Sequence, residues 1–150
     1  MLCSRNKTLG VCFGHQLLAV ALGGIVERSE KGWGAGVMPA NVVHKVPWMK
    51  NHLNDGYDIL YSHQDQVTRL PIDATLIATS EFCPNNTYCI HDIVFSMQGH
   101  PEFTRDYAKS RYDTRVDKLG QKTYDDAINS LDKKTDEMIV GDWIKEFFEG

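Results

Sequence analysis

The sequence lacks the features that would place the chain in a membrane or on nucleic acid. No apolar stretch approaches the roughly 18 residues that span a bilayer. No apolar run follows the charged residues of positions 1–7, so no signal peptide is predicted. The net charge of -4 supplies no basic field for a phosphate backbone. We therefore expect neither a nucleic-acid nor a membrane partner.

Cysteine is also scarce, and its spacing excludes two classes of protein. The four cysteines, at positions 3, 12, 83 and 89, form neither a C-x-x-C metal pattern nor a dense disulfide framework. Buried free thiols are predicted for Cys83 and Cys89, with a bond between them as the alternative. These features predict a reduced, cytoplasmic protein.

Metal and nucleotide motifs are missing as well. No Gly-x-x-x-x-Gly-Lys phosphate loop occurs, and the histidine spacing makes no metal site. We expect no cofactor and no metal. No catalytic role is predicted for four of the six histidines, which are His15, His44, His52 and His91.

What is present fits one globular domain over residues 1–150. Hydrophobic residues make up 42% of the chain and charged residues 24%. A chain of this length buries roughly 68–70% of the surface of its unfolded form, which is enough for a core. No repeat, low-complexity tract or linker divides it.

Hydrophobic periodicity predicts a strand, a tight turn and a helix within residues 8–24, with Gly23-Gly24 ending the helix. Residues 25–26 open a short strand, and the glycine-rich segment 31–36 is predicted to be a loop. Alternation over residues 36–46, interrupted by Pro39, indicates an edge strand. Further strands are predicted at Asp58–Tyr61, Ala74–Thr79, Thr87–Ile90 and Ile93–Met97.

The remaining pattern is a hairpin followed by helices. His91-Asp92 suits a hairpin turn between the last two predicted strands. Helical periodicity begins at Thr104, and the last helix carries an apolar stripe of Ile139, Trp143, Ile144 and Phe147. The mixed charges of residues 101–150 indicate solvated helix faces. Strands before helices with one hairpin predict an α/β sandwich with a mostly parallel sheet.

The strongest chemical signal is Gly-Val-Cys-Phe-Gly at residues 10–14, where a strand meets a helix. A sharp turn there holds a nucleophile above the sheet, and small residues on either side allow close approach of neighbouring groups. The positive end of the following helix favours a thiolate at Cys12. The backbone N–H of Phe13 is placed to donate to an oxyanion. A buried cysteine in a glycine-rich turn is the alternative.

The second signal is Gln-Gly-His-Pro-Glu at residues 98–102. In extended backbone, residues i and i+2 share a side, and Pro101 biases His100 away from a helix. His100 and Glu102 are therefore expected to lean toward one place, as a base and the carboxylate that orients it. A surface His-Pro turn is the alternative. The two signals together predict a Cys-His-Glu triad.

These motifs resemble the class I glutamine amidotransferase family. The resemblance rests on Gly-Val-Cys-Phe-Gly-His-Gln at residues 10–16 and on the distant His-Pro-Glu. The runs at residues 61–67 and 97–104, and the glycine-rich segment 31–36, resemble free-standing relatives of the GMP synthase amidotransferase domain, including the γ-glutamyl peptidases. The similarity covers about residues 7–107.

The resemblance implies a flavodoxin-like three-layer α/β/α sandwich that hydrolyses a γ-glutamyl amide through a thioester on Cys12. Gln16 corresponds by position to a residue that contacts the substrate. Ser62, His63 and Gln64 would form the wall that receives the glutamyl amino-acid end. For Gln16 a helix-surface role is the alternative, and for His63 a structural role.

The sequence departs from the family pattern before Cys12. Family domains have earlier strands and helices, and an early loop supplies a second oxyanion donor; this N-terminal portion is absent here, so we expect a truncated domain. Losing one oxyanion donor typically lowers the rate by about 10²–10³-fold. The strand at Thr8–Val11 is expected to have no neighbour on one side, which invites pairing with another chain.

The resemblance leaves three functional hypotheses. The first is a glutaminase-type protein that releases ammonia for a separate synthetase partner. The second is a stand-alone γ-glutamyl peptidase that acts on glutathione-like conjugates. The third is a non-catalytic remnant that self-associates through its bare strand.

Overall fold

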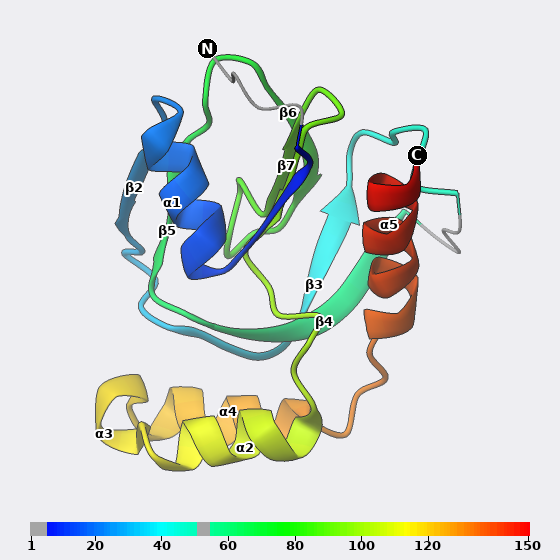
Figure 1. Cartoon of the computed structure of the whole chain (residues 1–150). Helices are drawn as coiled ribbons and strands as arrows, with labels where there is room; N and C mark the ends of the chain where they lie inside the picture. Colours follow the sequence, from blue (N-terminus) through cyan, green and yellow to red (C-terminus); the bar gives the residue numbers. More distant parts are fainter. Residues whose placement is uncertain (1–5, 51–54) are drawn as a thin grey trace.

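The computed structural model describes residues 6–50 and 55–150. Figure 1 shows the strands as a twisted sheet with helices on both sides and a group of helices beneath it. The elements are β1 (Thr8–Val11), α1 (Phe13–Ala21), β2 (Ile25–Arg28), β3 (Gly34–Val42), β4 (Gly56–His63), β5 (Asp65–Arg69), β6 (Ala74–Thr79), β7 (Thr87–Ile90), β8 (Val94–Met97), α2 (Arg105–Asp113), α3 (Val116–Leu119), α4 (Gln121–Ser130) and α5 (Glu137–Glu149).

Six strands form one sheet in the order β1-β8-β7-β6-β3-β4, and β2 pairs with β5 in a separate antiparallel ribbon. The α/β class is confirmed, but the predicted mostly parallel sheet is wrong: within the described residues only β1 and β8 run parallel. Parallel neighbours need a crossover of about a dozen residues or more, usually a helix. No helix is described between β3 and β8, so these strands pair antiparallel.

Two strand predictions had different outcomes. The hairpin at His91-Asp92 is confirmed, because β7 and β8 pair antiparallel around it and His91 has a φ of 48°. The edge-strand prediction for the segment with Pro39 is wrong, because β3 lies between β6 and β4. Pro39 is tolerated there because β6 pairs with β3 only at Asn41 and Val42, which leaves one side of Pro39 without a partner strand.

The predicted loop at residues 31–36 is only half correct. Its second half, from Gly34, begins β3 and pairs with the end of β4. Gly36 lies inside the strand with a φ of 92°, and a Cβ there would sit 2.4 Å from the Ser130 hydroxyl of α4. Glycine is required at this point so that α4 can pack directly on β3.

Helices cover opposite faces of the sheet, and β8 shows how. Successive side chains of a strand point to opposite faces. Val94 packs on the side of α1, in a cluster with Ala19. Phe95 packs on the other side, against Trp143 and Phe147 of α5. The apolar stripe predicted for the last helix is thus confirmed, with Val140 as a further buried member.

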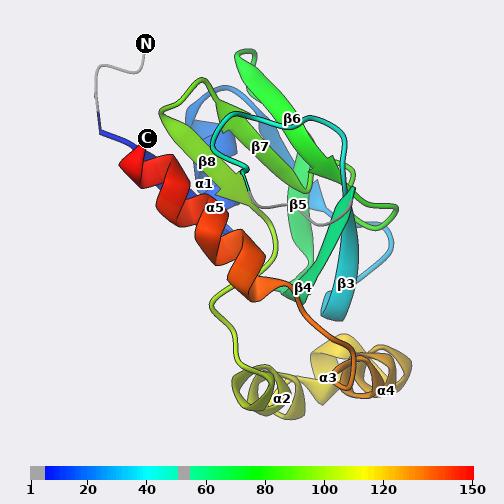
Figure 2. The same cartoon turned by 90° about the vertical axis from the view of Figure 1, so that its right-hand side faces the viewer.

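A second helical group, α2 to α4, lies beneath the ends of β3 and β4 (Figure 2). Tyr112 of α2 anchors it: the Tyr112 hydroxyl donates to the Tyr61 carbonyl oxygen at 2.6 Å and accepts from the Gly36 N–H at 2.8 Å. The Thr104 hydroxyl caps α2 by accepting from the Tyr107 N–H. These bonds fix the height of α2 above the sheet.

β1 stands at one margin of the sheet, where β8 is its neighbour among the described residues. The pairing runs in register from Thr8↔Val94 to Val11↔Met97. Because the strands are parallel, the segments that follow them leave the sheet at the same end. Cys12 and Gln98, each the next residue, therefore lie close together. No helix of the described residues is long and apolar enough to cross a membrane.

Candidate active site

Cys12 occupies the turn between β1 and α1 in a strained backbone conformation. Its φ of 52° and ψ of -105° are rare for a residue with a side chain and cost about 1–3 kcal/mol. The Cys12 N–H donates to the Met97 carbonyl oxygen at 3.0 Å, which holds the turn on β8. α1 begins at Phe13 with no acidic residue in its first turn, so its positive end meets the sulfur unopposed.

The two glycines around Cys12 have different roles. A Cβ at Gly10 would lie 2.6 Å from Leu18 Cδ1 and 3.0 Å from the Ser96 hydroxyl. A Cβ at Gly14 would meet nothing within 4 Å. The prediction that close approach requires small residues on both sides thus agrees with the contacts at Gly10, whereas at Gly14 it is wrong, because the first turn of α1 faces open space.

Alanine at these two positions should therefore have opposite effects on stability. Gly10→Ala is expected to lower the free energy of unfolding by about 1–3 kcal/mol, because Leu18 and Ser96 must move. Gly14→Ala is expected to raise it by up to about 1 kcal/mol, because alanine favours the helix. Urea unfolding followed by circular dichroism measures both. Equal losses in the two variants would contradict this account.

His100 is held beside Cys12 by the sheet and by Glu102. Its N–H donates to the Leu60 carbonyl oxygen at 2.8 Å, and its ring stacks on Phe103 with centroids 3.8 Å apart. The Nδ1 atom lies 2.7 Å from Glu102 Oε1. This arrangement leaves the other ring nitrogen for the sulfur of Cys12.

The charge of His100 is fixed by two opposing effects. Burial lowers the pKa of His100, but hydrogen bonds and charges from Cys12 and Glu102 outweigh burial and raise it to about 9. Burial likewise raises the pKa of Glu102, and the hydrogen bond from His100 outweighs this and lowers it. At neutral pH the pair is therefore an imidazolium and a carboxylate.

Two glutamines link the sulfur to the neighbouring strands. Gln98 is fully buried and donates from Nε2 to Cys12 Sγ at 3.5 Å. Its Oε1 accepts from Gln16 Nε2 at 3.1 Å, and the same Gln16 nitrogen donates to the Asp65 carbonyl oxygen. Gln16 therefore is not a free helix-surface residue. Gln98 was missed by the sequence interpretation, although it adjoins the His-Pro-Glu motif.

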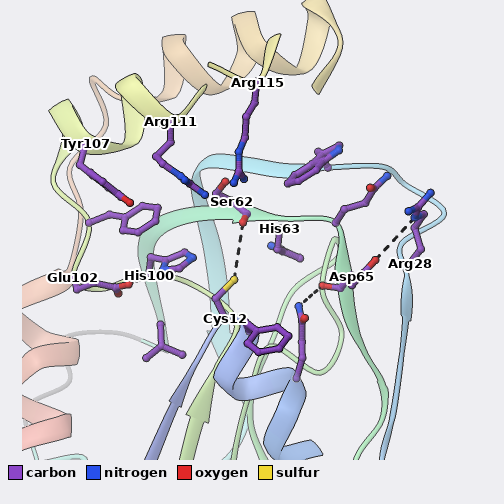
Figure 3. Close-up of a pocket in the computed structure, with 16 residues that line it drawn as sticks. Cys12, Arg28, Ser62, His63, Asp65, His100, Glu102, Tyr107, Arg111 and Arg115 are labelled. Carbon is purple, nitrogen blue, oxygen red and sulfur yellow. Dashed lines mark hydrogen bonds and ion pairs between the residues drawn. The ribbon is translucent and has the colours of Figure 1, made fainter. Parts of the chain in front are cut away.

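The end of β4 forms the opposite wall (Figure 3). The Ser62 carbonyl oxygen lies 4.0 Å from Cys12 Sγ, and the Ser62 hydroxyl is buried without a protein partner among the described residues. His63 bonds through Nε2 to Gln66 at 3.2 Å. Burial lowers the pKa of His63 to about 4, so this ring is neutral at pH 7. Gln64 completes the wall.

These residues surround a pocket of about 600 Å³ with Cys12 at its floor. All eight predicted site residues line it: Cys12, Phe13, Gln16, Ser62, His63, Gln64, His100 and Glu102. The rest of the lining consists of Val11, Arg28, Trp33, Asp65, Phe103, Tyr107, Arg111 and Arg115.

The basic part of this lining was not predicted. The charges of residues 101–150 were interpreted as solvated helix faces, but Arg111 and Arg115 reach down from the α2 region toward the pocket (Figure 3). Their spacing of four residues, which places two helical side chains on one face, was the signal available in the sequence.

The other histidines and cysteines have different surroundings. His15 is buried against Ser96 and Tyr88, and burial lowers its pKa to about 3. Cys83 and Cys89 are buried free thiols, as predicted. His44 and His91 lie outside the pocket, and Cys3 and His52 lie outside the described residues. No three His, Cys, Asp or Glu side chains of the described residues are grouped to hold a metal.

Comparison with known proteins gives concordant matches. The family model "Glutamine amidotransferase class-I" matches residues 2–115. Gamma-glutamyl peptidase 3 of Arabidopsis thaliana is 35% identical over 107 residues, which are 68% of this chain and 43% of that protein. One of the polypeptides of the glutamine-hydrolyzing GMP synthase of Methanococcus vannielii is 33% identical over 100 residues, 66% of this chain and 52% of that protein.

A solved structure shows the same fold. A glutamine amidotransferase from Thermotoga maritima superposes with a TM-score of 0.77 at 22% identity, covering 95% of this chain and 62% of that chain. This chain thus spans about half the length of the curated relatives it matches.

Proposed function

This chain belongs to the class I glutamine amidotransferase family, and we propose that it hydrolyses γ-glutamyl amides through a thioester on Cys12. The observation that carries the proposal is the charged arrangement at the pocket floor. Cys12 stands on a strained turn at a helix start, and His100 bonds to Glu102 at 2.7 Å with its pKa raised to about 9 by Cys12 and Glu102.

Acylation begins from a thiolate and an imidazolium. The Cys12 sulfur attacks the γ-carbonyl carbon, and a C–S bond forms while the carbonyl oxygen becomes an oxyanion. The N–H of Phe13 opens α1 and has no intrahelical acceptor, so it is free to donate to that oxyanion. His100 gives its proton to the leaving nitrogen, the C–N bond breaks, and the amine departs.

Deacylation reverses the role of His100. The ring is now neutral and removes a proton from water as the water oxygen attacks the thioester carbon. The C–S bond breaks, the γ-carboxylate of glutamate leaves, and the thiolate and imidazolium are restored. Glu102 orients the ring in both steps and stabilises its positive charge.

The glutamyl end of the substrate is assigned to the wall of Ser62, His63, Gln64 and Gln16. Both known bonds of Gln16 use its amide nitrogen, so its Oε1 remains to accept from a substrate ammonium. The buried Ser62 hydroxyl has no protein partner among the described residues and is available as a donor. The neutral His63 adds a polar edge without charge.

The assignment is tested by labelling the purified chain with a glutamine-mimicking diazo-ketone, read by peptide mass spectrometry. Selective labelling of Cys12 that excess glutamine prevents is the expected result. Labelling of a folded sample without glutamine protection, or none at all, would reject the hydrolase and favour the non-catalytic remnant.

Two substrate classes remain, and both have support among the relatives. A γ-glutamyl peptidase matches the name of the Arabidopsis relative. A glutaminase that supplies a separate synthetase matches the GMP synthase relative of Methanococcus vannielii. Turnover of glutamine and glutathione compared under the same conditions separates them.

Replacing Glu102 with glutamine should slow hydrolysis by about 10–100-fold, less than loss of the nucleophile or of His100. The Glu102 side chain is 56% exposed, so water replaces part of its effect. Glutamine keeps the ring in place but removes the charge, so the pKa of His100 should fall. Steady-state rates from pH 5 to pH 10 report both effects. A variant as inactive as one without Cys12 would show that Glu102 does more than orient the ring.

A further inference from the structure

Arg111 and Arg115 form the basic roof of the pocket, opposite Cys12. Arg111 lies in the last turn of α2, and Arg115 is the residue before α3. Figure 3 shows both side chains directed from these helices toward the pocket. Tyr112, between them in sequence, is anchored to Tyr61 and Gly36. The roof is therefore fixed to the same strands that carry Ser62.

No acidic group of residues 6–50 and 55–150 neutralises this roof. Neither arginine forms an ion pair there, and Arg111 Nε is buried without a hydrogen-bond acceptor. Arg115 lies over the Trp33 ring, 5.7 Å from its centroid. The acidic residues of the lining have other partners, since Asp65 pairs with Arg28 and Glu102 with His100. A buried, unpaired guanidinium nitrogen is costly unless a ligand supplies its acceptor.

We propose that Arg111 and Arg115 bind a carboxylate on the leaving-group side of the substrate. The guanidinium group presents parallel donors that match a carboxylate. The leaving group of glutamine is ammonia, which needs no cationic subsite. A pocket of about 600 Å³ falls within the range of roughly 300–1,000 Å³ that holds much larger ligands. The preferred substrate is therefore a γ-glutamyl peptide with a free C-terminal carboxylate.

This inference rests on the proposed function, and the same labelling reaction tests it without requiring turnover. γ-Glutamylglycine, its C-terminal amide and glutamine each compete with the diazo-ketone for Cys12. On the parent chain, the free acid should protect at about a 10- to 100-fold lower concentration than the amide. Arg111→Gln and Arg115→Gln should each remove most of this preference.

Two further variants keep the test decisive. Lys118→Gln removes one exposed positive charge from α3, outside the pocket, and should protect like the parent. Arg111→Lys retains the charge and should keep part of the preference, so it serves if Arg111→Gln fails to fold.

The outcomes separate the two proposals. No preference for the free acid on the parent, with glutamine still protecting, overturns the inference alone. Equal weakening of all three compounds by Arg111→Gln and Arg115→Gln assigns the arginines to the glutamyl α-carboxylate and overturns the leaving-group assignment. Failure of glutamine and both dipeptides to protect overturns the proposed function and the inference with it.

Discussion

Replacing Cys12 with alanine is expected to lower the hydrolysis of γ-glutamyl amides by about 10⁶-fold, to the background of the empty pocket. The variant keeps the pocket, the Phe13 N–H and the glutamyl wall, but no atom remains to form the thioester. Ammonia or amine release from glutamine and glutathione measures the loss. Binding should survive, because the proposed glutamyl contacts do not involve the sulfur.

Cys83→Ala provides the matched control. Cys83 is buried and lies outside the pocket, so its loss should leave the rate close to that of the parent. Burial raises the pKa of Cys83 to about 12, which keeps it an unreactive thiol. Activity that survives in Cys12→Ala and disappears in Cys83→Ala would reassign the nucleophile.

Replacing His100 with asparagine should lower the rate by about 10⁴-fold or more, because the leaving nitrogen and the attacking water lose their proton carrier. In the parent, the rate should fall as the pH rises through about 9, where the imidazolium loses its proton. His44→Asn, at an exposed site outside the pocket, is the control. Unchanged rates in His100→Asn would point to another base.

The same substitution has a signature in stability. The pKa of His100 is raised from 6.5 to about 9 in the folded chain, so its protonation stabilises the fold fully below pH 6.5 and progressively less up to pH 9. The difference in unfolding free energy between parent and His100→Asn should therefore shrink across this window, by up to about 3 kcal/mol. Urea unfolding at several pH values measures it.

Local patterns carried the sequence prediction of the site. A strand, a sharp turn and a helix around Cys12 follow from apolar spacing within a few residues. The extended segment from His100 to Glu102 likewise depends only on Pro101 and on the period of a strand. The structure brings these segments together because β1 and β8 are neighbours, and pairing of strands that are distant in sequence is not encoded in either motif.

Features that depend on distant contacts were missed or predicted wrongly. The direction of the strands between β3 and β8 depends on their connections, and the sequence shows only that each is apolar. Pro39 indicated an edge because the short pairing of β6 with Asn41 and Val42 is invisible in the sequence. Arg111 and Arg115 reach the pocket only because Tyr112 anchors α2 on Tyr61.

The backbone of Cys12 sets natural selection for chemistry against selection for stability. Glycine adopts a positive φ without steric strain. Glycine at position 12 would relieve about 1–3 kcal/mol of strain and forfeit about 0.5–1 kcal/mol of backbone entropy. A lineage released from the need for a thiol would thus drift toward glycine at this turn. A cysteine kept in this conformation is what continued use of its sulfur would leave in the sequence.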